Sequence, residues 1–199
     1  MTSGMTEPVG AHSDQGTREY QQDAYDYNQF ADPDRWCVAV ADGLGFSSGS
    51  DMIANAAVGL AVKIAEHVAA DHPALVLEIT RAVLPEMARY AAEGSRAAHH
   101  LEAFGDDTTS RSVADTALVV ATITEFGEVH VSWLGDCRAY ILTVDGRLIQ
   151  LTDDHNRASI GRPDFITRTL RVPGGVPMFV VKSRGDAWLV TVLGEVGCR

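Results

Sequence analysis

Positive charge is scarce in this chain of 199 residues. Sixteen Lys and Arg stand against 27 Asp and Glu, and the formal net charge is -11 at pH 7. This balance argues against the broad basic face that nucleic acid or an anionic lipid surface attracts. The composition therefore predicts no nucleic-acid partner, and it favours small cations over polyanions as ligands.

Cysteines and long apolar runs are also few. The three cysteines Cys37, Cys137 and Cys198 show no C-x-x-C spacing, which argues against a disulfide framework and a structural zinc site. Residues 1–10 lack the basic flank and apolar run of a signal peptide. The most apolar helical stretch, 52–62, is far shorter than the roughly 20 residues that span a bilayer. We therefore expect a cytoplasmic protein that does not enter membranes.

Acidic residues gather near the start of the chain. Seven acids and two arginines lie in the first 35 residues, which accounts for nearly half of the net charge. A solvated acidic face is the ordinary explanation of such a cluster. Carboxylates collected for a hard divalent cation are the more specific one.

The hydrophobic pattern predicts an α+β fold in a single domain over 1–199. Helical spacing covers 50–68, with Ser50 or Asp51 as the cap, and 75–100, where we expect Pro85 to end one helix and start another. Strands are expected at 36–41, 117–124, 128–134, 138–144, 178–181 and 187–192, whereas 165–171 is ambiguous. Because short turns join successive strands, the sheet should be antiparallel, with the helices outside it.

Four aspartates are expected at strand ends or tight turns: Asp23, Asp42, Asp136 and Asp154. Loop residues held by a rigid sheet often carry function, and a glycine beside an aspartate lets the backbone approach a ligand closely. Ordinary turn chemistry also uses Asp-Gly pairs, so spacing alone leaves both explanations open.

Five segments carry motifs whose combination is more specific than any one of them. They are Arg18–Ala24, with an arginine five residues before an aspartate; Val40–Gly45, with an Asp-Gly pair; Leu134–Tyr140, with a Gly-Asp turn; Leu151–Asn156; and Ile166–Leu170. In order and spacing, over about residues 11–190, they resemble the metal-dependent (PPM, or type 2C) Ser/Thr protein phosphatases.

This resemblance implies a β-sandwich flanked by helices, with two Mn²⁺ or Mg²⁺ ions in a cleft at one edge and a weaker third ion in many members. It implies phosphoserine and phosphothreonine proteins as substrates and a metal-activated water as the attacking group. Arg18 would bind the phosphate through its planar guanidinium.

The resemblance also implies the residues that would hold the metals. Asp42 would bridge two ions, and the carbonyl of Gly43 would bind one of them. Asp23, with Gln22 beside it, would hold metal-bound waters. Asp136 corresponds to a ligand of the third ion.

Two later metal aspartates of the family have no counterpart here. Residues 185–190 resemble the strand that leads to the first of them, but Leu193 stands at its position, and the divergent tail 191–199 contains no Asp-Asn pair. We therefore expect a C-terminally truncated domain that lacks the last sheet and helix segment. Because fewer carboxylates would hold the ions, we also expect weak or no turnover.

Two other functions fit part of the pattern. A chain that keeps Arg18 and Asp42 without the late ligands could be a pseudophosphatase, a regulatory module that binds phosphoproteins without hydrolysing them. Residues 45–49 fit the G-x-S-x-G elbow of a serine α/β-hydrolase, with Ser47 as nucleophile and His155 downstream, although only one apolar strand precedes Ser47. Under the phosphatase interpretation, we expect His155 to position a loop.

Overall fold

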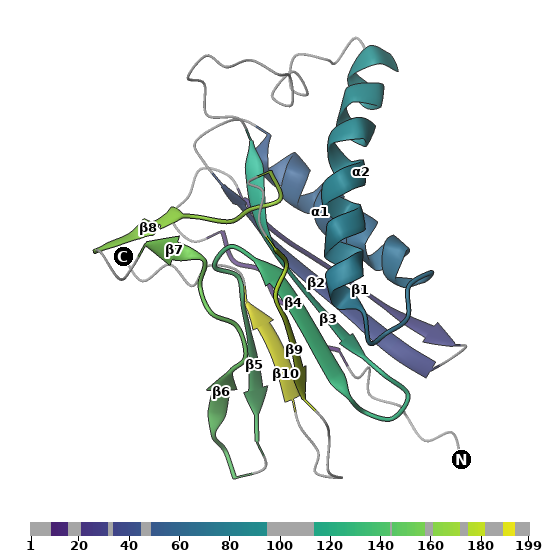
Figure 1. Ribbon diagram of the computed structural model, residues 1–199, viewed down its shortest axis with the longest axis vertical. Helices are drawn as coiled ribbons and strands as arrows, with labels where there is room; N and C mark the ends of the chain where they lie inside the picture. The colour runs from purple at the N-terminus through teal and green to yellow at the C-terminus, as the bar shows by residue number, and fades with distance from the viewer. Residues whose placement is uncertain are drawn as a thin grey trace.

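The part of the chain that the computed structural model describes consists of antiparallel strands and two helices (Figure 1). The structure describes residues 9–15, 21–31, 34–44, 49–94, 114–143, 145–157, 161–171, 175–181 and 189–193. Every strand pairing in this part of the chain is antiparallel, as the sequence predicts. The α+β class is therefore confirmed.

The larger sheet has five strands in the order β1-β2-β3-β4-β9. Their bounds are Asp23–Ala31, Asp34–Leu44, Asp115–Ile123, Val129–Leu134 and Met178–Val181. The second sheet has the order β10-β5-β6, with bounds Leu189–Leu193, Arg138–Leu142 and Leu148–Gln150. A separate pair is formed by β7, Asn156–Arg157, and β8, Arg162–Ile166. Strands β1, β6, β7 and β8 are not among those that the sequence pattern predicts.

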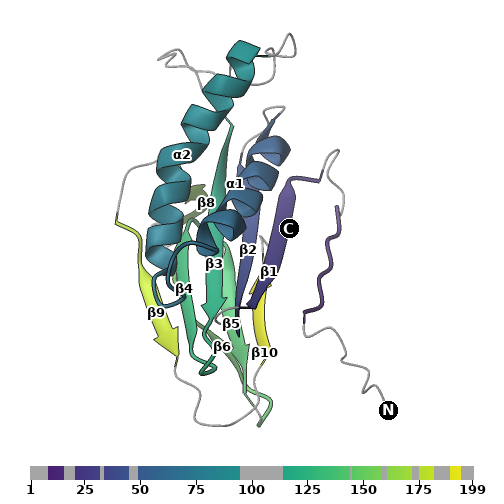
Figure 2. The same ribbon diagram turned by 90° about the vertical axis from the view of Figure 1, so that its right-hand side faces the viewer.

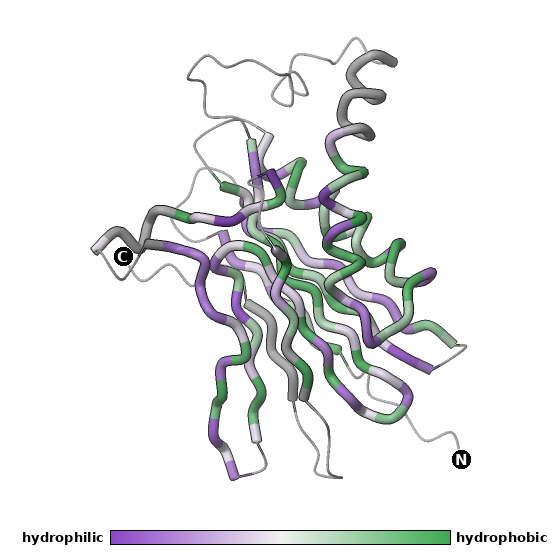
Figure 3. Tube along the Cα trace, viewed as in Figure 1, coloured by the Kyte–Doolittle hydropathy of each residue, from purple (hydrophilic) through white to green (hydrophobic). Residues whose placement is uncertain are grey.

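The larger sheet separates two apolar layers, and β3 contributes to both. Leu118 and Val120 belong to the layer beneath the helices, whereas Ala117, Val119 and Ala121 belong to the layer between the sheets. Neighbouring side chains of a strand point to opposite faces, so a strand covered on both faces is apolar along its length. Figure 3 shows this concentration of hydrophobic residues in the central strands.

Both helices cover the outer face of the larger sheet (Figure 2). Helix α1, Ser50–Ala65, places Ala54, Ala57 and Ala61 fully buried against the strands. Small side chains at these positions let the helix approach the sheet closely. Within the described residues, no helix is both long and apolar enough to cross a bilayer.

Two expectations about the helices are wrong. Helix α2, Pro73–Gly94, continues through Pro85 as one helix. Proline removes one backbone hydrogen bond, and the buried face of Val76, Leu77 and Leu84 holds the helix on the sheet despite that loss. The N-cap of α1 is Gly49, without a side-chain cap hydrogen bond, and Ser50 is already helical.

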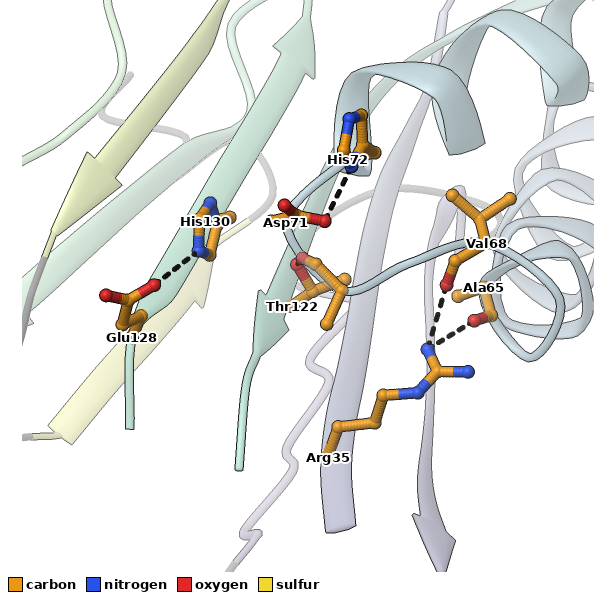
Figure 4. Close-up of polar contacts among 9 residues, drawn as sticks. Arg35, Ala65, Val68, Asp71, His72, Thr122, Glu128 and His130 are labelled. Atoms are coloured by element: carbon orange, nitrogen blue, oxygen red, sulfur yellow. Dashed lines mark hydrogen bonds and ion pairs between the residues drawn. The ribbon is translucent and has the colours of Figure 1, made fainter. Parts of the chain in front are cut away.

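Arg35 of β2 fixes the C-terminal end of α1 to the sheet (Figure 4). Its guanidinium donates to the carbonyl oxygens of Ala65 at 2.6 Å, Glu66 at 2.7 Å and Val68 at 3.1 Å, and it lies 4.5 Å from the centre of the Phe30 ring. A cation here satisfies carbonyls that have no partner within the helix and complements the helix dipole. The opposite end of α1, at Ser50, is thereby held in a defined place.

Candidate active site

Acidic residues from separate strands meet at one end of the larger sheet. Asp23 of β1 pairs in register with Asp42 of β2, and Asp42 pairs with Ala117 of β3. Gly135, immediately after β4, packs against Ala117, and Asp136 follows it. Directly paired residues share one face of a sheet. We call Asp23, Asp42 and Asp136 the carboxylate row.

All three carboxylates of the row act electrostatically on one buried group, the Cys137 thiol. The Cys137 thiol is buried between the sheets. Burial raises the pKa of this thiol well above its ordinary value, and the negative charges of Asp42, Asp136 and Asp23 raise it further. Cys137 is therefore a neutral packing residue, and the negative potential of the row is concentrated beside it.

The backbone around Gly43 is tightly enclosed. Its N–H donates to the carbonyl of Gln22 at 3.0 Å, and the Gln22 side-chain amide donates to the hydroxyl of Ser50 at 2.9 Å. The Thr116 hydroxyl donates to the carbonyl of Asp42 at 2.8 Å. A Cβ at Gly43 would lie 2.6 Å from the carbonyl oxygen of Ser50, so only glycine fits. These contacts fix the chain that carries Asp42, which is 2% exposed.

The described residues bring together most of the site that the resemblance implies. Gln22, Asp23, Asp42, Gly43 and Asp136 lie in one region of the larger sheet. Arg18, the proposed phosphate-binding residue, lies outside the described residues, as do Ser47, Cys198 and the stretch 182–188.

The donor chemistry of the carboxylate row suits a hard divalent cation. Carboxylate oxygens, together with a backbone carbonyl such as that of Gly43, are the ligands that Mg²⁺ and Mn²⁺ prefer. Among the residues that the structure describes, no three His, Cys, Asp or Glu side chains form a group that could hold a metal ion. The residues fit the ions in ligand type, and further ligands are needed to complete the site.

Asp115 is a half-buried acid next to the row that the sequence analysis did not single out. It pairs in register with Leu44 and accepts hydrogen bonds from the Thr116 N–H at 2.8 Å, the Arg171 N–H at 3.3 Å and the Thr169 hydroxyl. Burial raises the pKa of Asp115, and these hydrogen bonds lower it by less. Asp115 therefore holds the segment around Thr169 on the sheet. No local signal in the sequence indicates which distant segment a strand-end aspartate holds.

The segment Leu151–His155 runs along the turn that contains Asp136. The Leu151 N–H donates to the carbonyl of Ala139 at 2.8 Å, and the Ala139 N–H donates to the Thr152 hydroxyl at 3.2 Å. The Arg138 guanidinium donates through Nε to Asp154 at 2.7 Å, with a second bond from Nη2. Asp154, which the sequence placed among the candidate acids, thus pairs with Arg138.

We expect His155 to make the protein less stable in mild acid. Burial, and secondarily the Arg168 guanidinium, lower the pKa of His155 below its ordinary value of 6.5, against the opposing effect of Asp153 and Asp154. As the pH is lowered below that value, His155 is protonated in the unfolded chain but remains neutral in the folded chain. The free energy of unfolding therefore decreases as the pH decreases. Urea unfolding at about pH 7.5 and about pH 5.5 measures this loss.

The control for this measurement is His155→Asn, which cannot titrate. Its loss of stability between the two pH values should be smaller than that of the natural chain, whereas His72→Asn, at an exposed histidine, should not reduce the loss. Equal losses in the natural chain and His155→Asn would contradict the assignment.

The fold is therefore a β-sandwich with helices over one of its two antiparallel sheets. Its candidate site consists of acidic residues at one end of the larger sheet. A sequence model described as "Protein phosphatase 2C" matches residues 11–172. The chain therefore belongs to the protein phosphatase 2C family, which confirms the resemblance. Its function class is that of a metal-dependent protein Ser/Thr phosphatase.

Solved structures of low sequence identity share the fold. The serine/threonine phosphatase Stp1 from Staphylococcus aureus is 15% identical with a TM-score of 0.61, covering 84% of this chain and 67% of that one. PppA, described as a regulatory component of T6SS in Pseudomonas aeruginosa, is 20% identical with a TM-score of 0.56, covering 87% and 70%. A stage II sporulation E family protein from Thermanaerovibrio acidaminovorans is 19% identical with a TM-score of 0.56, covering 84% and 79%. A comparison with curated proteins finds no match.

Proposed function

We propose that this chain removes phosphate from phosphoserine and phosphothreonine in proteins, with Mn²⁺ or Mg²⁺ at the carboxylate row. The observation that carries the proposal is the direct register of Asp23 with Asp42, with Asp136 on the turn that packs against Ala117, the β3 partner of Asp42. The negative potential of three carboxylates attracts divalent cations. The proposal includes one domain over residues 1–199, a cytoplasmic location and a role in signalling.

Each residue of the site has a distinct part in this proposal. Asp42 and the carbonyl of Gly43 would hold ions directly, Asp23 would hold ion-bound waters, and Asp136 would hold a further ion. The ions supply a water of lowered pKa and offset the negative charge of the phosphoryl oxygens. Arg18 would orient the phosphate through paired hydrogen bonds.

The test is hydrolysis of p-nitrophenyl phosphate and of a phosphothreonine peptide with added Mn²⁺. We expect turnover that a chelator removes and that excess Mn²⁺ restores, because the metal supplies the nucleophile. The control is hydrolysis by the same chain when chelator is present throughout the assay. Equal hydrolysis with and without chelator would contradict the proposal.

A second function, phosphoprotein binding without hydrolysis, is favoured by the position of Leu193. Strand β10 ends at Leu193, in register with Arg138, two residues beyond Asp136. An apolar residue there adds no negative charge to the carboxylate row, so ions would be held less firmly. Phosphopeptide binding that Arg18→Ala removes, together with no turnover, would support this second function.

We expect Leu193→Asp to strengthen Mn²⁺ binding, by about tenfold if one added carboxylate contributes about 1.4 kcal/mol. The reason is the end-of-strand position of Leu193 beside the Asp136 turn. Titration calorimetry with Mn²⁺ measures the change. Leu189→Asp is the matched control, because Leu189 lies at the other end of β10, in register with Leu142. Equal gains in both variants would show only a general effect of charge.

A further inference from the structure

His155 holds Gly135 from both sides. The His155 N–H donates to the carbonyl of Gly135 at 2.8 Å, and the Gly135 N–H donates to Nδ1 of the His155 ring at 3.2 Å. One residue thereby uses its backbone and its side chain on the same glycine. Both polar groups of that peptide position are engaged by a segment 20 residues further along the chain.

The plane of the His155 ring is fixed by the core. The ring stacks on Trp133, with centroids 6.0 Å apart and planes 12° from parallel. Trp133 is 5% exposed in the layer between the sheets, and its Nε1 donates to the carbonyl of Asp153 at 2.8 Å. Offset stacking at this separation is favourable. The ring nitrogen that meets Gly135 is therefore held in a defined direction.

The other side of the ring meets the segment after β8. The Thr167 N–H donates to the His155 carbonyl at 2.6 Å, and Nη1 of Arg168 lies 3.4 Å from Nε2 of the ring. Because Nδ1 accepts a hydrogen bond from Gly135, the hydrogen of the neutral ring is on Nε2, so the approach of Arg168, which is also a donor, is a contact and not a hydrogen bond. A protonated ring would set an N–H against the Gly135 N–H, so the contacts require the neutral form.

The backbone conformation of Gly135 sets the direction in which the Asp136 side chain points. Its φ is +93°, and a Cβ there would lie 2.4 Å from the Cβ of Ala117. Only glycine fits this turn, and glycine is also the residue with the greatest backbone freedom. A small rotation at Gly135 would turn the Asp136 carboxylate away from the carboxylate row. Bonds on both polar groups of Gly135 oppose that rotation.

We propose that His155 is a positioning residue that fixes the Asp136 turn, so that the Asp136 carboxylate is preorganised for a divalent cation. This inference rests on the proposed role of Asp136 as a metal ligand. His155 also joins the Asp136 turn to the segment of Thr167 and Arg168. Residues that orient metal ligands commonly change metal affinity by about 10–100-fold when they are replaced.

The first test is Mn²⁺ binding, measured by calorimetry on the full chain with Mn²⁺ alone. His155→Phe keeps a flat ring on Trp133 but removes the acceptor, and it should weaken binding to the Asp136-dependent site by about tenfold. His155→Asn keeps an acceptor, because its Oδ1 is separated from the backbone by the same number of bonds as Nδ1 of histidine. The Mn²⁺ affinity of this variant should stay within about threefold of that of the natural chain. Asp136→Asn identifies the site, and His72→Asn at the exposed histidine is the control.

The second test measures the rigidity of the Gly135–Asp136 turn in the metal-free protein. Amide hydrogen exchange at Gly135, followed by NMR, should be faster in His155→Phe than in the natural chain, and His155→Asn should restore the protection. Unchanged Mn²⁺ affinity in His155→Phe, or equal losses in the Phe and Asn variants, would overturn the inference. If the natural chain does not bind Mn²⁺, the proposed function fails, and the exchange rates still decide whether His155 fixes the turn.

Discussion

Asp42→Asn is expected to lower Mn²⁺-dependent hydrolysis by about 100-fold or more. Asparagine has the shape of aspartate but lacks its charge, and Asp42 lies between Asp23 and Ala117 at the centre of the site. Each 1.36 kcal/mol of lost transition-state stabilisation is about tenfold in rate, and the charge stabilisation that a bound metal supplies is several kcal/mol. Initial rates over a range of Mn²⁺ concentrations measure the effect.

The stability of the same variant separates lost chemistry from lost folding. Asp42 is buried with two other carboxylates nearby, so removing one negative charge relieves repulsion in the metal-free protein. The melting temperature in chelator should therefore stay equal or rise. Asp145→Asn, at an exposed aspartate bonded to Arg147, is the matched control and should keep full activity. Activity above about a tenth of the natural value in Asp42→Asn would contradict the central role of Asp42.

The strands rich in apolar residues could be predicted from the sequence. The central strands β2, β3 and β4 and the edge strand β9 fall where the pattern places them. Strand β1, at the other edge of the sheet, could not be predicted in this way, because most of its residues are polar. Of its nine residues, only Ala24 and Phe30 are buried. An edge strand needs few apolar residues, because its backbone hydrogen bonds to β2 hold it in the sheet.

The helix details show where local rules give way to packing. Pro85 is a local signal for a helix end, but the buried face of α2 keeps the helix continuous. Ser50 is a good capping residue by type, yet its hydroxyl accepts from Gln22 of another segment. In both cases a tertiary contact decides the outcome, and such contacts are not encoded in the local pattern.

In the candidate site too, residues marked by short motifs could be predicted from the sequence, whereas contacts between distant segments could not. Short motifs identify Asp42 and Asp136 because a glycine beside an aspartate is visible in the sequence. The anchoring of the 167–171 segment by Asp115 and the hold of His155 on Gly135 could not be predicted to this detail, since they join residues 54 and 20 positions apart. The register that aligns Asp23 with Asp42 also appears only when β1 is known.

Gly43→Ala is expected to destabilise the fold strongly, through steric overlap at a site residue of ordinary backbone conformation. A Cβ at this position would lie 2.6 Å from the oxygen and 2.8 Å from the carbon of the Ser50 carbonyl, and 3.0 Å from the carbonyl oxygen of Gln22. All three atoms belong to backbone, so no side chain can rotate away. Either the start of α1 or the start of β1 must move, and the hydrogen bond from Gly43 to Gln22 is lost with that movement.

Overpacking of this kind costs about 1–3 kcal/mol, and we expect Gly43→Ala to reach the upper part of that range because Arg35 prevents α1 from shifting freely. Urea unfolding followed by circular dichroism measures the free energy of unfolding. Gly59→Ala is the matched control in the middle of α1, where the nearest atom to a new Cβ is Asp26 Oδ2 at 3.8 Å. That variant should gain about 0.5–1 kcal/mol, because alanine favours a helix over glycine. Opposite signs for the same chemical change would show that the close approach of Ser50 to Gly43, rather than glycine content, sets the stability of the site. A Gly43→Ala protein as stable as the natural chain would show that α1 is free to move.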